Sequence, residues 1–195
     1  LVEELEREEQ AFWRLGQLGF ADLEGAYEDL RLLRDGPPHA PASARRREVL
    51  ARLAPTLVAE IARSGAPDRA LHHTATFLST IGARTSYLHL LLENPGIRGL
   101  LVRLFATSEF LSSFFLRHPE LLDSLVRADL VRIVRPRADL EAELGGRLAA
   151  APDLEAELDD LRRFRHEEFL RIGVHDIQGK LEPAEVGAQL STVAE

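Results

Sequence analysis

Apolar residues recur every three or four positions along almost the whole chain, and no stretch shows sustained alternation with period two. The helical spacing is clear in Glu3–Leu18 and again in Leu23–Arg34, after which a proline-rich loop begins at Gly36. Leucine, alanine, arginine and glutamate predominate, and these residues favour helix. The sequence therefore predicts an all-α fold: an irregular multi-helix bundle of about ten short-to-medium helices, with no sheet.

Proline and capping residues predict where the later helices begin. Ser43 is expected to cap a long helix, and Pro55 lies within its apolar stripe, so we expect a kink or a split there. Further helices are expected from Pro67 to about Gly82, over 85–94 and 95–106, from Ser108, from Pro119, over 139–150, from Asp153 to about 173–177, and from Pro183.

Composition excludes several classes of protein. The chain has 195 residues, enough for a sizeable core, and no cysteine, so disulfides and thiolate chemistry are excluded. No apolar run reaches the roughly 18 residues needed to span a bilayer, and the acidic start is unlike a secretory signal. A net charge of −8 argues against nucleic-acid binding. We therefore expect a cytoplasmic protein with neither a membrane nor a nucleic acid as partner.

Charge divides the chain into three blocks. Residues 1–35 carry a net charge of −6, residues 36–135 of +5 and residues 136–195 of −7. We interpret these blocks as N-terminal acidic linker helices, a central helical bundle and C-terminal helices. Because the chain starts without methionine and ends in a helical pattern without a stop signal, we expect a piece of a longer polypeptide.

Two short motifs point weakly to catalysis. Gly145-Gly146 followed by Asp153 and Glu155 superficially resembles a nucleotidyltransferase signature, which needs two carboxylates on a strand to hold magnesium ions. The flanking residues are helical, so we favour a glycine irregularity and a helix cap at Asp153. His175-Asp176 is similar to a metal-phosphohydrolase pair, but further ligands are missing. The chain is thus predicted to hold no catalytic, cofactor-binding or metal-binding residue.

Two other patterns are weaker still. His89 and Glu93 are four residues apart, which is typical of an ordinary surface pair. Trp13, Leu15 and Gly16 fall one residue short of a helical-repeat signature, and no second copy follows. Neither pattern predicts a site.

Arginines form the densest basic cluster of the acidic C-terminal block. We take four of them as candidate interdomain or partner contacts, because arginine forks bind carboxylate or phosphate well: Arg162, Arg163, Arg165 and Arg171. The alternative is pairing within the helix, for which four acids lie within reach: Asp159, Asp160, Glu167 and Glu168.

Three stretches together carry a family resemblance. They are Arg-Thr-Ser-Tyr-Leu-His-Leu-Leu-Leu-Glu-Asn-Pro at 84–95, the segment 101–125 with its Arg-His-Pro-Glu-Leu-Leu-Asp run, and 161–176. Together they resemble the helical region of the glutamine synthetase adenylyltransferase family, whose members adenylylate and deadenylylate their target. The segment 18–22 is also similar to the start of the region that joins the two halves of such enzymes.

This resemblance implies a function for the parent polypeptide. The family carries two nucleotidyltransferase domains: one transfers AMP from ATP to a tyrosine of glutamine synthetase, and the other removes it by phosphorolysis. The chain would be the helical linker region before the second domain, supporting and orienting the catalytic halves. The family's glycine turn and paired aspartates have no match here, so magnesium and ATP are implied for the parent only. The implied partners are other domains of the same polypeptide, glutamine synthetase and the PII protein.

Within that interpretation, the helix containing the arginine cluster would act as a lever, with Leu161 and Phe164 in its core. Two alternatives remain open. One is a free-standing helical protein-interaction module, and the other is a metal phosphohydrolase that uses His175 and Asp176.

Overall fold

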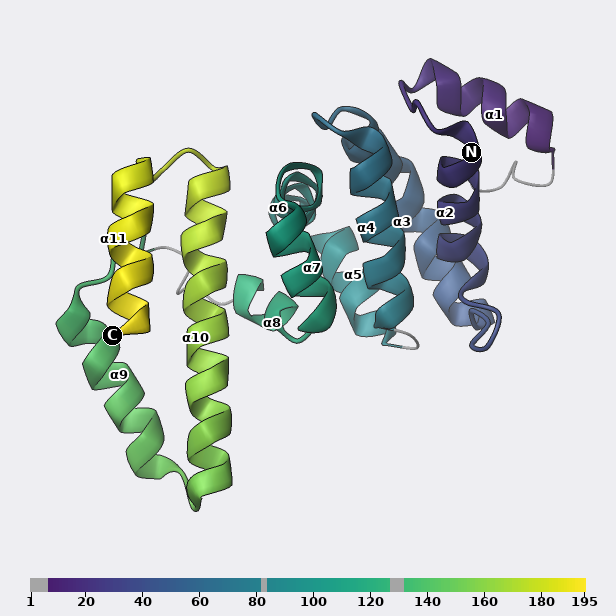
Figure 1. Ribbon diagram of the computed structural model, residues 1–195. Coiled ribbons are helices and arrows are strands. Elements are labelled where there is room, and N and C mark those ends of the chain that lie inside the picture. The colour runs from purple at the N-terminus through teal and green to yellow at the C-terminus, as the bar shows by residue number, and fades with distance from the viewer. Residues whose placement is uncertain (1–6, 82–83, 127–131) are drawn as a thin grey trace. The chain divides into compact units, whose positions relative to one another are not determined.

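The computed structural model describes residues 7–81, 84–126 and 132–195 (Figure 1). Within these ranges the chain forms eleven α-helices and no strand, which confirms the all-α prediction. The described residues divide into two compact units, one ending at Pro119 and the other beginning at Glu120. This division follows packing, whereas the three blocks above follow charge and stay a prediction.

The first unit contains seven helices in an irregular bundle. They are α1 (Glu8–Gln17), α2 (Leu23–Asp35), α3 (Ala44–Ala62), α4 (Pro67–Thr80), α5 (Thr85–Glu93), α6 (Pro95–Thr107) and α7 (Glu109–Arg117). Helix α4 contacts α2, α3, α6 and α7, and so lies at the centre of the unit (Figure 1). Residues 3–6 and Gly82, which belong to expected helices, lie outside the described residues.

An aromatic cluster fills the space between α4, α6 and α7. The ring centroids of Phe77 and Phe115 are 5.2 Å apart, and Phe105 lies 5.9 Å from Phe77 and 6.0 Å from Phe115. All three side chains are fully buried. Because each buries a large apolar area and prefers tilted contacts, this cluster fixes how the three helices pack.

Arginine side chains donate hydrogen bonds to backbone carbonyls at the C-terminal ends of three helices of the first unit. Arg46 donates to the carbonyl of Leu78 at 2.8 Å, and Arg98 donates to the carbonyl of Leu91 at 3.0 Å. Arg69 on α4 donates in the same way to the carbonyl of Ala106, at the end of α6. The last carbonyls of a helix lack a partner in the helix and lie at its negative end, so a guanidinium satisfies and stabilises them.

Helix caps lie where the sequence predicts them. The side chains of Asp22, Ser43, Ser108 and Asp153 each accept a hydrogen bond from the backbone amide three residues further on. These caps satisfy amide donors that the first turn leaves unpaired. The predicted starts of α2, α3, α7 and α10 are therefore confirmed.

Pro55 does not split its helix: α3 continues through it from Ala44 to Ala62. Pro55 and Ala51 are both exposed. The carbonyl of Ala51 that loses its amide partner therefore faces solvent, where water can satisfy it. The expected split was wrong, because the lost hydrogen bond lies on the exposed face of the helix; the alternative of a kink at Pro55 stays a prediction.

The second unit contains four helices: α8 (Leu121–Val126), α9 (Arg137–Ala150), α10 (Leu154–Ile177) and α11 (Pro183–Ala194). Helix α10 is the longest and contacts each of the others (Figure 1). Gly145 and Gly146 lie inside α9, which continues through them. The expected glycine irregularity was therefore wrong, because neighbouring residues propagate the helix across both positions.

Candidate functional site

The second unit is held together by a buried network of arginine and glutamate side chains. Arg135, just before α9, donates at 2.5 Å to Glu168 of α10 and at 2.5 Å to Glu143 of α9. Glu168 is 3 % exposed, and its other oxygen accepts from Arg171 at 2.8 Å. One carboxylate thus joins two guanidinium groups away from solvent.

Gln189 brings α11 into this network. Its side-chain oxygen accepts from Arg171 at 2.9 Å and from the backbone amide of Arg135 at 3.2 Å. Arg171 also donates to the carbonyl of Ile133 at 2.7 Å. The segment before α9 is therefore fastened to α10 and α11 through its backbone as well as its side chains.

A partly exposed branch extends the network along α9. Arg147 donates to Glu143 at 2.5 Å and to Glu167 of α10 at 2.7 Å. Its guanidinium also lies 5.4 Å from the centre of the Phe164 ring, within the range of a cation–π contact. The branch therefore joins α9 to α10 a second time.

The network is electrically balanced, with three arginines and three glutamates. Burial alone would raise the pKa of Glu143, but hydrogen bonds from Arg135 and Arg147 outweigh it and hold that pKa below its usual value. Burial likewise acts to lower the pKa of Arg135, and the glutamates around it reverse that effect and raise the pKa. Glu143 and Arg135 are therefore both favoured in their charged forms.

Such an arrangement is suited to fixing geometry rather than to chemistry. A buried ion pair gains little over an apolar pair of the same size, but breaking one partner is costly, so the network specifies a single arrangement of the helices. The carboxylates are occupied by guanidinium groups. In the described ranges, no group of three or more histidine or acidic side chains is placed to hold a metal ion.

The four arginines predicted as contact residues do not share one surface. Arg162, Arg163 and Arg165 are exposed, whereas Arg171 is buried in the network. Arg162 pairs with Asp159 at 2.8 Å, as the alternative of pairing within the helix predicts, and Arg165 lies 5.0 Å over the Phe169 ring. Their role as partner contacts stays a prediction.

Of the two residues predicted to be in the core on this helix, one is buried and the other is not. Phe164 is buried, but Leu161 is 39 % exposed. The two residues are three apart and occupy neighbouring positions on α10, but it is the Phe164 ring that contacts Arg147 of α9. The prediction for Leu161 was wrong because an apolar residue on a helix need not meet another element.

The residues of the weaker sequence motifs either lie apart in the structure or have a structural role. His175 is buried, and its neighbour Asp176 is exposed, so the two do not converge on one site. Asp153 caps α10 through the amide of Ala156 at 2.9 Å. Trp13 lies exposed on α1. None of these residues assembles a catalytic arrangement.

Sequence reasoning missed most of the network. The spacing of Glu143 and Arg147, four apart, and of Glu168 and Arg171, three apart, is the signal that would have indicated two of its pairs. The contacts of Arg135 with Glu168 and Gln189 span 33 and 54 residues, and no local pattern indicates them.

The sequence pattern of the glutamate-ammonia ligase adenylyltransferase family matches residues 99–195. A bifunctional glutamine synthetase adenylyltransferase/adenylyl-removing enzyme of Pseudomonas aeruginosa is 36% identical over 199 residues, which cover 100% of this chain and 20% of that enzyme.

Enzymes of the same description from other bacteria are similar to this chain. The enzyme of Thioalkalivibrio sulfidiphilus is 34% identical over 183 residues, covering 93% of this chain and 19% of the enzyme. The enzyme of Neisseria meningitidis is 31% identical over 189 residues, covering 96% of this chain and 21% of the enzyme. The chain therefore spans about a fifth of the length of the curated relatives it matches.

Proposed function

Because this chain is homologous to a part of the bifunctional glutamine synthetase adenylyltransferase/adenylyl-removing enzymes, we propose that it is a non-catalytic helical part of such an enzyme. The parent transfers AMP from ATP to a tyrosine of glutamine synthetase and removes it by phosphorolysis. The chain supports and orients the two catalytic halves. Magnesium and ATP bind in the catalytic halves and not in this chain.

The observation that carries this proposal is what the acidic side chains near Gly145 and Gly146 bind in the structure. The glycines lie within helix α9 and form no phosphate-binding turn. Glu143 is bound by two arginines, and Asp153 is used as a helix cap. These carboxylates are committed to holding the second unit together, which supports a structural role.

The proposed partners follow from the same homology. Other domains of the polypeptide contact the chain, and glutamine synthetase and the PII protein are further partners. The exposed arginines on α10, Arg162, Arg163 and Arg165, are the proposed contact residues, because unburied guanidinium groups bind carboxylates of a partner. Among the described helices, none has the length and apolar character needed to cross a membrane.

An adenylylation assay tests this proposal. The purified chain is incubated with magnesium, labelled ATP and glutamine synthetase, and labelled AMP on glutamine synthetase is measured. We expect no transfer above the level of a reaction without the chain. Transfer by the chain alone would contradict the proposal, because it would require nucleotide-handling residues within this chain.

One observation favours the second candidate, a free-standing helical protein-interaction module. Three exposed leucines lie on one side of α10: Leu154, Leu158 and Leu161. A pull-down with the catalytic halves of the Pseudomonas aeruginosa enzyme separates the candidates. A supporting part binds them, and a free-standing module does not.

A further inference from the structure

Helix α10 carries an exposed apolar stripe on its N-terminal half. Leu154, Leu158 and Leu161 are 68 %, 42 % and 39 % exposed. Their spacing of four and then three residues is the spacing of a seam between two paired helices, and Arg165 occupies the next position of the same series. We call these three leucines the leucine stripe.

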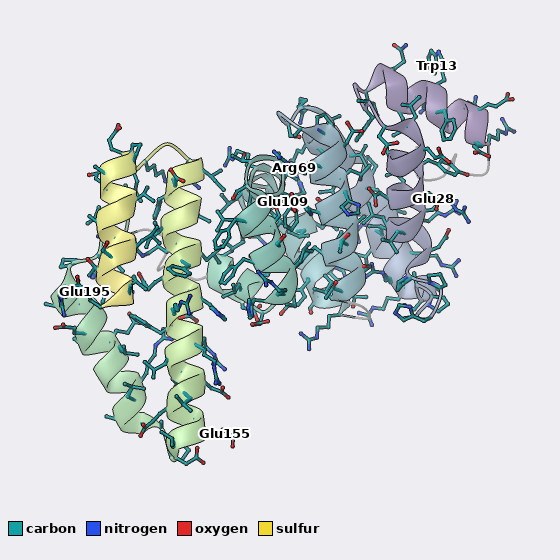
Figure 2. All side chains as sticks on the ribbon, in the orientation of Figure 1. Trp13, Glu28, Arg69, Glu109, Glu155 and Glu195 are labelled. Atoms are coloured by element: carbon teal, nitrogen blue, oxygen red, sulfur yellow. The ribbon has the colours of Figure 1, made fainter. Side chains whose placement is uncertain are left out.

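Charged residues beside the leucine stripe are complementary to one another. Glu155 and Arg162 are both exposed and lie on the same flank of the stripe, seven residues apart. Figure 2 shows Glu155 at the end of α10 that is joined to α9. Arg162 contacts Asp159 on its own helix in an exposed pair, which is a weak interaction. When an acid and a base lie one heptad apart on the same flank, an antiparallel copy of the helix can place its base opposite the acid and its acid opposite the base.

The register of such a pairing follows from the seam positions. When Leu158 of one copy faces Leu161 of a second copy in antiparallel orientation, Glu155 of the first faces Arg162 of the second. The two-fold axis generates the same two contacts again with the copies exchanged. A parallel pairing would instead place the two copies' Glu155 and Arg162 flanks on opposite sides of the seam, so Glu155 of one copy would not reach Arg162 of the other.

We infer that two copies of this chain associate through antiparallel pairing of their leucine stripes, with reciprocal contacts between Glu155 and Arg162. The stripe covers about two helical turns, so the interface is at the small end of the range for specific complexes, and association is weak and depends on concentration. This inference uses the exposed face of α10, which includes Arg162 among the contact residues proposed above.

Sedimentation equilibrium of the 195-residue chain over a wide concentration range gives the first test. The wild-type chain is expected to show a monomer–dimer equilibrium, and Leu158→Asp is expected to remain monomeric with an unchanged helical circular dichroism spectrum. Leu190→Asp, at an exposed leucine on α11, is the matched control and should dimerise like the wild type. A chain that is monomeric at every concentration, or equal behaviour of the two variants, would overturn the inference.

Charge exchange gives the second and sharper test. Arg162→Glu and Glu155→Arg should each raise the dissociation constant of the homodimer about tenfold, since two attractive contacts become repulsive. An equimolar mixture of the two variants should recover association, because acidic flanks then meet basic flanks. Asp159→Asn, which removes only the partner of Arg162 within the helix, should not weaken association. A mixture that associates no better than either variant alone would contradict the pairing.

Discussion

The guanidinium of Arg135 donates a hydrogen bond to the carboxylate of Glu168 at 2.5 Å, across 33 residues of sequence. Both side chains are buried, and the contact holds the segment before α9 against α10. Glu168 also accepts a hydrogen bond from Arg171, so its single negative charge is shared between two positively charged guanidinium groups. The arrangement of the second unit therefore depends strongly on this one side chain.

Glu168→Gln is expected to destabilise the second unit by about 3–5 kcal/mol, because it leaves buried guanidinium groups without their carboxylate. Urea unfolding followed by far-UV circular dichroism measures the change. The single tryptophan, Trp13, lies in α1 and reports on the first unit only. Glu141→Gln is the control, since its pair with Arg137 is exposed and its loss should change stability far less. Equal effects of the two substitutions would refute the assigned role of Glu168.

Stability should depend on pH through Glu143. Hydrogen bonds from Arg135 and Arg147 outweigh burial and hold its pKa below the usual value. A carboxyl whose pKa is lower in the folded chain stabilises the fold above its unfolded pKa, and this stability is lost as pH falls through the folded pKa. We therefore expect the free energy of unfolding to fall below about pH 4.3, and to fall less steeply in Glu143→Gln.

Unfolding free energies measured from pH 3 to pH 7 test this dependence. Glu141→Gln again serves as the control for loss of a carboxylate in the same helix. A Glu143→Gln profile parallel to that of the wild type would show that the arginines do not act on this carboxyl.

Gly145→Ala and Gly146→Ala are each expected to stabilise α9 by about 0.5–1 kcal/mol, since alanine restricts the unfolded chain and favours helix. Both glycines are exposed, and a Cβ at either position would meet no atom within 4 Å. Gly36→Ala should have the opposite sign, because Gly36 has φ of 76° and its Cβ would lie 2.8 Å from the carbonyl oxygen of Ala40. Thermal unfolding of the three variants gives the comparison. A loss of stability in either α9 variant would mean that the helix is not continuous there.

Phe105→Ala is expected to destabilise the first unit by about 3–5 kcal/mol, because it removes a fully buried ring from the cluster with Phe77 and Phe115. Phe110→Ala removes a ring that is 64 % exposed and should cost less than about 1 kcal/mol. Denaturant unfolding followed by circular dichroism and by Trp13 fluorescence compares the two. Similar losses would place the core of the first unit elsewhere.

The helices of this chain are predictable from sequence because their signals are local. Asp22, Ser43, Ser108 and Asp153 precede their helices directly, and each cap forms as expected. Pro55 shows the limit of such reasoning. Its effect depends on whether the freed carbonyl faces water, and only packing decides that.

The candidate site is much less predictable. The sequence predicts Arg171 as a candidate interdomain or partner contact, but Arg171 is buried. Its guanidinium donates to Gln189 of α11 and to two carbonyls of the segment before α9. Periodicity predicts Leu161 in the core, yet its side chain is 39 % exposed. Periodicity identifies an apolar face and does not identify what packs on it.

Replacing the aligned segment of the Pseudomonas aeruginosa enzyme with this chain tests most directly whether the chain supports and orients the catalytic halves. We expect the chimaera both to adenylylate and to deadenylylate glutamine synthetase. Glu168→Gln in the chimaera should lower both activities, while Glu141→Gln should leave them unchanged. Full activity of the chimaera carrying Glu168→Gln, with the second unit shown by proteolysis to be disordered, would contradict it.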